Sequence, residues 1–162
     1  MNIVLFEPEI PANTGNIGRT CVASDTALHL IEPLGFRLND KMVKRSGLDY
    51  WDRLDLHRHI DWEHFYKEHG SGTLFFATTK ARRRYDEVSY PEDAYIVFGK
   101  ESAGIPEEIL VEHEEGCIRI PMAGDTRSLN LSNAVSIILY EALRQNGFMG
   151  LNEKGNLHRL KW

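Results

Sequence analysis

The chain has 162 residues, of which 42% are hydrophobic and 27% charged, and its formal net charge is −5. A chain of this length buries about two-thirds of its unfolded surface around one core, so we expect a single domain over residues 1–162. The composition is that of an ordinary globular protein and excludes the disordered and fibrous classes. The acidic balance excludes a protein that coats nucleic acid through bulk attraction, because such domains carry a basic surplus. Any RNA contact must therefore be focal.

The first residues have none of the features of a targeting segment. Residues 1–7 have neither a basic start nor a small-residue cleavage site, and they read as a first strand. No apolar run approaches the roughly 18 residues that a membrane span needs. We therefore expect a cytoplasmic protein that makes no membrane contact.

Five short apolar runs, rich in β-branched and aromatic residues, are strand candidates. They are continuous rather than alternating, and polar segments long enough for helices separate them, which is typical of a parallel sheet covered on both faces. We therefore expect an α/β fold with a mostly parallel sheet of five or six strands and helices on both faces. The runs are residues 3–6, 29–31, 74–77, 95–98 and 118–120.

A polar segment, residues 13–20, follows the first strand candidate and the approach formed by residues 7–11. Two prolines stiffen the approach to it, and its glycines permit close approach of a ligand to the backbone. Asn13, Asn16 and Arg19 place amide and guanidinium groups near a helix start, which suits a phosphate. The spacing matches neither a dinucleotide fingerprint nor a P-loop. A simple helix-capping turn is the alternative interpretation.

Cysteines and histidines give no metal-ligand pattern. The chain has two cysteines, Cys21 and Cys117, whose spacing indicates neither a zinc ligand set nor a disulfide framework. We expect both in or near the core. Histidines also gather in one stretch: His57, His59, His64 and His69. No carboxylate or cysteine spacing turns this group into a recognisable ligand set, so no metal is expected.

Basic residues concentrate in two places. Lys41, Lys44 and Arg45 form a loose group, for which a solvated loop is an equal alternative. The denser group, called the basic run below, consists of Lys80, Arg82, Arg83 and Arg84. A run of like charges costs self-repulsion unless an anionic partner offsets it, so the basic run indicates a phosphate contact.

Polar loops follow the fourth and fifth strand candidates. In residues 98–106, Gly99 lets a flat ligand lie against the backbone, and Pro106 can start the next helix. In residues 118–133 a strand breaks into a polar loop, whose free backbone groups can bind the edge of an adenine. Ligands of open α/β sheets bind beyond the carboxyl ends of the strands, so we expect the site here. Ordinary turns and helix caps are the alternative.

The clearest helix begins near Ser132 and Asn133, which supply cap chemistry, and runs to Gln145. Its core stripe follows helical spacing: Val135, Ile138, Leu139, Ala142 and Leu143. Ile137 and Tyr140 lie on another face, which favours a subunit interface over scattered surface residues. Residues 148–162 form a short C-terminal tail that we expect to fray.

Three ordered motifs stand out along the chain. They are Asn13-x-Gly15-Asn16-Ile17-x-Arg19, Gly99-x-Glu101-x-x-Gly104-Ile105-Pro106, and Ile118-Arg119-Ile120-Pro121-Met122 continuing to Ser128-Leu129-Asn130-Leu131-Ser132-Asn133. Together they resemble the motifs of SPOUT-class RNA ribose methyltransferases. The resemblance is sharpest to the compact branch, the transfer RNA (cytidine/uridine-2′-O-)methyltransferases that modify the wobble nucleotide. Residues 7–11, 47–50 and 78–80 also fit that branch, so the likeness covers nearly the whole chain.

The resemblance implies methyl transfer from S-adenosylmethionine to the ribose 2′-hydroxyl of the wobble cytidine or uridine in the anticodon loop of transfer RNA (tRNA). It also implies a C-terminal trefoil knot, which the pattern of residues cannot show, and a homodimer in which each active site is completed by the partner. No metal is required. By matching position, the donor-binding residues are Ala77, Thr78, Gly99, Ile120, Ser128 and Leu129.

Roles in the chemistry also follow from matching positions. We interpret Arg19 as a catalytic residue that orients a nucleotide phosphate, because a guanidinium is almost always protonated and makes a poor base. The other catalytic candidates are Asn13, Glu101, Ser128 and Asn130. RNA contacts are assigned to Arg19, Arg127, Tyr140 and the basic run.

Two other functions stay open. An RNA-binding or assembly factor could keep this fold without turnover. A small-molecule hydrolase would need a nucleophile with a paired base, but Ser102 lies in Gly-Lys-Glu-Ser-Ala-Gly rather than in a G-x-S-x-G elbow. The sequence leaves open which tRNAs are modified and whether cytidine, uridine or both are accepted.

Overall fold

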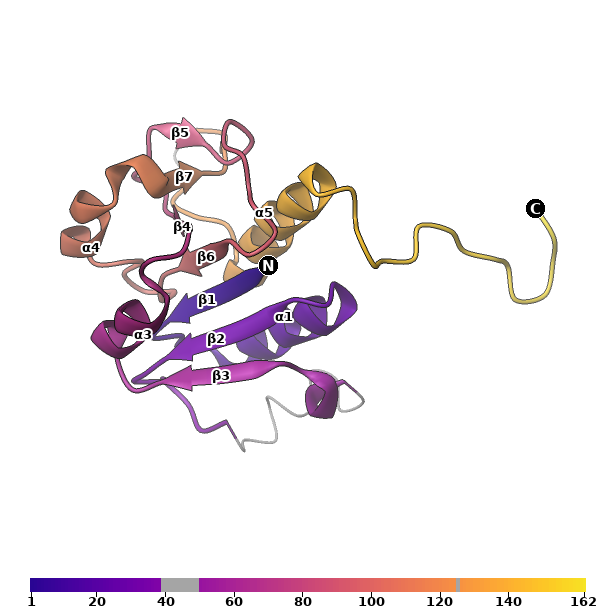
Figure 1. Cartoon of the computed structure of the whole chain (residues 1–162), viewed down its shortest axis with the longest axis horizontal. Coiled ribbons are helices and arrows are strands. Elements are labelled where there is room, and N and C mark those ends of the chain that lie inside the picture. The colour runs from indigo at the N-terminus through magenta and orange to yellow at the C-terminus, as the bar shows by residue number, and fades with distance from the viewer. Residues whose placement is uncertain (39–49, 125) are drawn as a thin grey trace.

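Figure 1 shows the computed structural model of the chain, which describes residues 1–38, 50–124 and 126–162. Within these ranges a seven-stranded sheet has the order β3-β2-β1-β6-β4-β7-β5, and each of its strand pairs is parallel. The strands are β1 (Asn2–Phe6), β2 (Ala27–Ile31), β3 (Leu56–His59), β4 (Leu74–Ala77), β5 (Arg83–Arg84), β6 (Tyr95–Phe98) and β7 (Cys117–Arg119). The predicted parallel α/β class is confirmed, and each predicted run contributes to a strand.

The predicted count of five or six strands is wrong, because β3 and β5 were missed. β3 reads Leu-His-Arg-His and β5 is a pair of arginines, so neither has an apolar run. Both are edge strands, which pair on one side only. Charged and short strands are common at sheet edges because they discourage pairing with other chains. An apolar-run criterion therefore detects the centre of this sheet and overlooks its borders.

In the described parts of the chain, four helices flank the sheet: α1 (Pro11–Ala23), α3 (Trp62–His69), α4 (Glu107–Glu112) and α5 (Leu131–Gln145), with short 3₁₀ turns η1 (Trp51–Arg53) and η2 (Glu114–Gly116). The predicted core stripe of α5 is buried, and its predicted end at Gln145 is confirmed. Its predicted start is wrong by one to two residues. Asn130 is the N-cap, since its side-chain oxygen accepts a hydrogen bond from the Ser132 backbone N–H at 3.0 Å.

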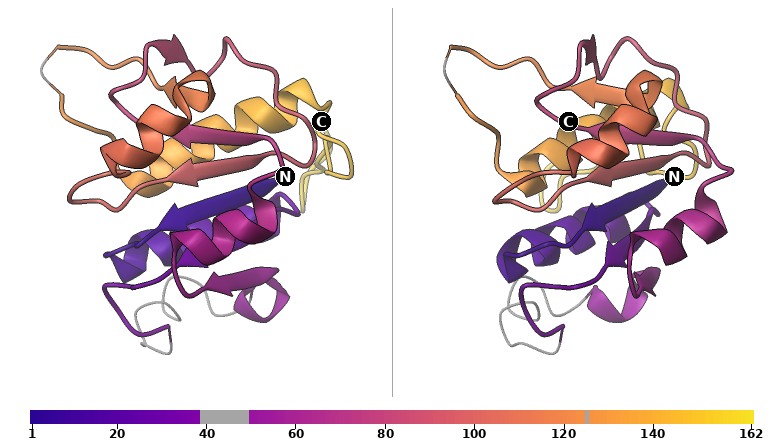
Figure 2. Two further views of the ribbon diagram at one scale, coloured as in Figure 1. Left: turned by 60° about the vertical axis from the view of Figure 1, so that its left-hand side comes forward. Right: turned by 90° about the vertical axis from the view of Figure 1, so that its left-hand side faces the viewer.

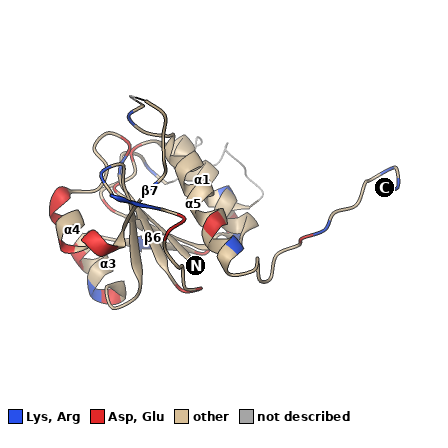
Figure 3. Cartoon of the chain, turned by 90° about the horizontal axis from the view of Figure 1, so that it is seen from above, with Lys and Arg blue, Asp and Glu red and all other residues tan. Residues whose placement is uncertain are grey.

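The helices cover both faces of the sheet, α1 and α5 on one and α3 and α4 on the other (Figures 2 and 3). Successive side chains of a strand point to opposite faces, so β1 serves two cores. Ile3 and Leu5 pack into the core beneath α1 and α5, whereas Val4 and Phe6 pack into the core beneath α3 and α4. Both cores hold the strand ends in place, and the site is built there.

Residues 151–162 extend away from the body of the molecule as a tail that contains neither helix nor strand (Figure 1). Leu160 and Trp162 are 72% and 92% exposed, so apolar burial does not anchor them. Among the described helices, none combines the length and apolar character required to cross a lipid bilayer.

Candidate active site

A cavity of about 580 Å³ lies beyond the carboxyl ends of β4, β6 and β7. Its walls come from the loops that follow these strands and from the first residues of α1 and α5. This is the edge at which parallel sheets bind ligands, and the volume is that of a small-molecule site. We call it the donor cavity.

All six residues predicted to bind the donor line this cavity: Ala77, Thr78, Gly99, Ile120, Ser128 and Leu129. They come from three loops that are far apart in the sequence and are brought together by the order of the strands. Apolar residues to which sequence analysis gave no role also line the cavity: Ile10, Phe98, Ile105, Ile118, Met122 and Leu131. Their signal in the sequence was their position within a motif, or directly beside one.

Gly99 occupies a place where no side chain fits. A Cβ atom there would lie 2.1 Å from the carbonyl carbon of Gly104 and 2.3 Å from the nitrogen of Ile105. The loop closes on itself because the Gly104 N–H donates to the Lys100 carbonyl at 2.8 Å, and Gly104 itself has a φ of +75°. The closed loop requires glycine at position 99 and presents bare backbone to the cavity.

Glu101 holds three segments together at the cavity. Its carboxylate accepts hydrogen bonds from the backbone N–H groups of Glu9 and Ile10, at 2.8 and 3.3 Å, and from the Asn13 side-chain amide at 2.8 Å. The Asn13 side-chain oxygen in turn accepts from the Asn130 amide at 3.0 Å. Three predicted catalytic residues therefore form one network, which fixes the starts of α1 and α5 to the loop after β6.

Two further carboxylates, which sequence analysis did not assign, stabilise the same loops. Glu9 accepts hydrogen bonds from the Ser102 hydroxyl and backbone N–H at 2.8 and 2.9 Å, and these bonds lower the pKa of the Glu9 carboxyl below its ordinary value. Glu7 pairs with Lys100 at 2.7 Å. Because the Ser102 hydroxyl donates to a carboxylate rather than to an imidazole base, its geometry does not favour the hydrolase alternative.

Arg19 and Tyr140 lie outside the lining of the donor cavity. Arg19 is exposed on α1, with its guanidinium carbon 5.2 Å from the centroid of the Tyr50 ring. Tyr140 is 44% exposed on α5. Arg127, by contrast, lines the cavity together with Ser128. The structure thus brings together the predicted donor residues and most of the catalytic candidates, but not Arg19.

Each member of the basic run has an acidic partner within the chain. The pairs are Lys80–Glu107, Arg82–Glu114, Arg83–Glu115 and Arg84–Asp86, with nitrogen–oxygen distances of 2.8, 3.2, 2.8 and 2.9 Å. Intramolecular partners therefore offset the repulsion that sequence analysis took to indicate RNA. Exposed ion pairs contribute little to stability, so a phosphate can still compete for the cations. The other basic group, Lys41, Lys44 and Arg45, lies outside the described residues.

A parallel α/β sheet with a nucleotide-sized cavity between a glycine loop and a helix start defines a protein that binds a nucleotide-like ligand. The model of the SpoU rRNA Methylase family matches residues 1–140. The chain therefore belongs to the SpoU rRNA methylase family, and the likeness to RNA ribose methyltransferases seen in its motifs is confirmed.

Individual relatives agree with this assignment. The chain is 48% identical over 151 residues to a tRNA (cytidine(34)-2′-O)-methyltransferase of Escherichia coli, covering 93% of this chain and 96% of that protein. A solved structure described as giving insights into the 2-OH methylation of C/U34 on tRNA is 42% identical, with a TM-score of 0.86 and coverage of 90% and 95%. An AdoMet-bound rRNA methyltransferase from Sinorhizobium meliloti is 26% identical, with a TM-score of 0.79 and coverage of 88% and 55%.

Proposed function

We propose that this chain transfers a methyl group from S-adenosylmethionine to the ribose 2′-hydroxyl of the wobble cytidine or uridine, nucleotide 34, of tRNA. The observation that carries the proposal is the donor cavity, in which six residues predicted from the motifs meet at the ends of three strands. The E. coli relative, which is similar over nearly its whole length, bears the name of this activity. The proposal places the enzyme in the cytoplasm and needs no metal for methyl transfer.

The residues of the donor cavity fit S-adenosylmethionine. A volume of about 580 Å³ is that of a site for a molecule of nucleoside size. Gly99 lets the loop after β6 fold tightly against Gly104 and Ile105, and this closed loop shapes one wall of the cavity. When bound, S-adenosylmethionine supplies a methyl group that the positive sulfur has already activated. The protein is then left with alignment of the reactants, exclusion of water and removal of one proton.

The Glu101 network performs the alignment. It fixes Asn13 and Asn130 at the cavity wall, where both amides can orient a ribose without moving themselves. The Asn130 side chain makes three hydrogen bonds with described residues. Its amide donates to Asn13, and its oxygen accepts from the Ser132 N–H and hydroxyl at 3.0 and 2.7 Å. Such preorganised polar groups need no rearrangement at the moment of reaction. Ser128, the other polar catalytic candidate, lines the same wall.

In this proposal, Arg19 of one copy of the chain contacts the RNA that is bound at the donor cavity of a second copy. It is exposed on α1 and outside the cavity of its own chain, although α1 packs directly against α5. Exposed apolar residues accompany it: Ile10, Ile137 and Tyr140 are 45%, 37% and 44% exposed. A homodimer formed through α1 and α5 would cover these side chains and bring Arg19 to the partner's cavity. Tyr140, Arg127 and the basic run are the other proposed RNA contacts.

The C-terminal trefoil knot belongs to the same proposal. From β7 the chain passes through the loop that lines the donor cavity, and α5 then packs against β6 and α1. A knot at this point would hold the donor loops together from both sides. The single domain over residues 1–162, with residues 148–162 as a tail, is part of the proposed organisation.

Calorimetry combined with a transfer assay tests the function. We expect the protein to bind S-adenosylmethionine and to methylate a tRNA anticodon stem-loop at nucleotide 34. The matched control is the same RNA already carrying the 2′-O-methyl group at that nucleotide, which should accept nothing. RNA binding without donor binding would instead establish the factor that lacks turnover. Mapping 2′-O-methylation in tRNA from cells that lack the protein would identify the tRNAs concerned.

A further inference from the structure

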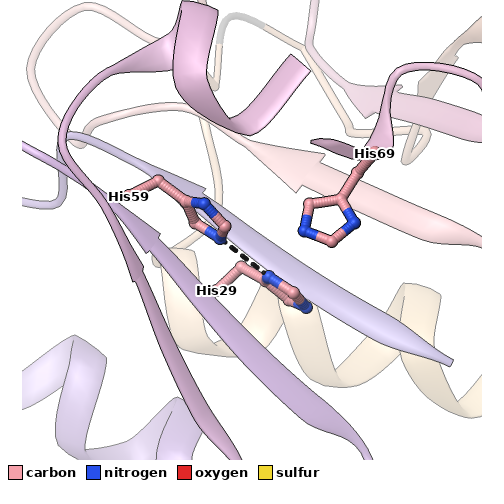
Figure 4. Close-up of side chains that lie close together, drawn as sticks. All are labelled: His29, His59 and His69. Carbon is pink, nitrogen blue, oxygen red and sulfur yellow. Dashed lines mark hydrogen bonds between the residues drawn. The ribbon is translucent and has the colours of Figure 1, made fainter. Parts of the chain in front are cut away.

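Three histidines from three elements meet between α3 and the β2–β3 edge of the sheet (Figure 4). His29 lies within β2, His59 ends β3 and His69 ends α3. One ring nitrogen of each lies within 4.8 Å of those of the other two. We call them the histidine cluster. Sequence analysis grouped His59 and His69 with their neighbours but missed His29, which the parallel pairing of β2 with β3 brings beside them.

The buried histidines of this cluster are not satisfied by their protein partners. His29 and His59 are 2% and 3% exposed, and a single contact of 3.0 Å joins Nδ1 of His29 to Nε2 of His59. The other nitrogens, Nε2 of His29 and Nδ1 of His59, have no hydrogen-bond partner among the described residues. A buried polar atom without a hydrogen-bond partner destabilises the folded chain, so an ordinary packing role does not account for two of them.

Two further histidine rings pack around the cluster. His57 stacks on His29 at 4.6 Å, and His64 lies 5.9 Å from His59 between ring centroids. A neutral imidazole offers one ring nitrogen as a metal ligand.

Two neighbouring groups suit a metal ion at this cluster. The Tyr95 hydroxyl is 3.0 Å from Nδ1 of His69, which fixes the ring and leaves its Nε2 for the metal. Glu68 Oε2 is 3.6 Å from Nδ1 of His59 and 3.7 Å from Nε2 of His69, too far for a hydrogen bond but close enough to join the ligands. Two nitrogens at the usual zinc distance of 2.0–2.1 Å lie about 3.3 Å apart in a tetrahedral site, so the 3.0 Å pair needs only a small displacement.

We propose that the histidine cluster binds one zinc ion through His29, His59 and His69, with Glu68 or a water molecule in the fourth position. Nitrogen ligands around a tetrahedral centre suit zinc, and calcium or magnesium would require oxygen ligands. The ion would tie edge strand β3 and helix α3 to β2. The ion would have a structural role, because the donor cavity lies beyond β4, β6 and β7 on the other side of β1.

A second group, His59, His64 and Glu68, shares one member with this cluster. His64 and Glu68 are each about half exposed and lie one helical turn apart on the surface of α3. Water can satisfy the hydrogen bonds of such exposed groups without a metal, so the proposal rests on the histidine cluster.

Zinc titration of the full-length protein, first stripped with a chelator, tests the site. We expect one zinc ion per chain with a Kd of about 1 μM or tighter by calorimetry, together with a higher temperature of unfolding. Cobalt, used as a spectroscopic probe, should show the intense visible bands of tetrahedral nitrogen ligation. A Kd weaker than about 100 μM, or an octahedral cobalt spectrum, would overturn the proposal. Neither readout depends on methyl transfer, so the site can fail while the proposed function stands.

Substitutions then assign the ligands. His69→Gln, at the partly exposed end of α3, should weaken zinc binding about 100-fold or more, as removal of one of three ligands requires. The control is His57→Gln, which touches His29 by stacking but belongs to neither ligand group, and its zinc affinity should stay unchanged. Abolished zinc binding in His64→Gln with normal binding in His69→Gln would move the ion to the surface group and refute the assignment. The cobalt spectrum of the unsubstituted protein decides the matter if His69→Gln does not fold.

Discussion

Two polar clusters of this sheet, the Glu101 network and the histidine cluster, differ in how their hydrogen bonds are satisfied. The Glu101 carboxylate accepts three hydrogen bonds from residues at the start of α1, and Asn13 there accepts a further one from Asn130 at the start of α5. In the histidine cluster, two buried ring nitrogens have no partner among the described residues. A satisfied network is rigid before any ligand arrives, whereas an unsatisfied one costs stability until a ligand completes it. The first is therefore already ordered in the free protein, as its proposed role in aligning the reactants requires, whereas the second leaves two buried nitrogens without a partner among the described residues.

Among the predicted variants, Gly99→Ala should have the largest effect, because Gly99 lies in the same loop as Glu101 and lines the donor cavity. The new methyl group would collide with backbone atoms 2.1 and 2.3 Å away, which cannot rotate aside as a side chain could. We expect kcat/KM for methyl transfer to fall by about 1000-fold, or about 4 kcal/mol, with donor binding abolished in calorimetry. The control is Gly155→Ala in the tail, where a Cβ would meet nothing within 4 Å. Unchanged donor affinity in Gly99→Ala would remove this loop from the donor site.

Arg19→Ala separates RNA alignment from donor binding. Because Arg19 lies outside the donor cavity, donor affinity should stay nearly the same. Methyl transfer should fall at least ~100-fold, a loss of roughly 2.7 kcal/mol in transition-state stabilisation. Arg53→Ala, which removes an exposed arginine from η1, is the matched control. Full transfer activity in Arg19→Ala would exclude this residue from the mechanism.

Glu101→Gln tests whether the network is as fully satisfied as its hydrogen bonds indicate. The substituted amide keeps the shape but turns an NH₂ group toward donors that the carboxylate accepted from. We expect the free energy of unfolding to fall by about 1–3 kcal/mol, measured by urea denaturation. Glu112→Gln, at the exposed end of α4, should leave it unchanged. Equal stabilities of the two variants would show that the three hydrogen bonds contribute nothing.

Neutralising the basic run should have the smallest effect. Replacing Lys80, Arg82, Arg83 and Arg84 with Gln should weaken tRNA binding and flatten its salt dependence by about 0.7–0.9 for each phosphate that is no longer neutralised. The effect is limited because acidic partners already occupy these cations. Glu114→Gln with Glu115→Gln is the converse variant and should strengthen binding. An unchanged salt slope in the first variant would make the basic run an ordinary solvated surface segment without an RNA contact.

Sequence alone was sufficient wherever the signal is local. Continuous apolar runs mark strands that are buried on both faces, so β1, β2, β4, β6 and β7 could be predicted. Helical spacing predicted the buried stripe of α5. The six donor residues were assigned because the motifs carry them in order, and the loops after parallel strands end at one edge.

Only the tertiary structure decided features that depend on partners distant in the chain. β3 and β5 form because a neighbouring strand offers hydrogen bonds, although β3 is mostly polar and β5 is a pair of arginines. His29 joins the histidine cluster through a partner 30 residues away, and the acidic partners of Arg82 and Arg83 lie 32 residues further along. Local pattern records whether a segment is buried, but not which charge or ring nitrogen will face it. That depends on strand order, which the packing of the whole sheet determines.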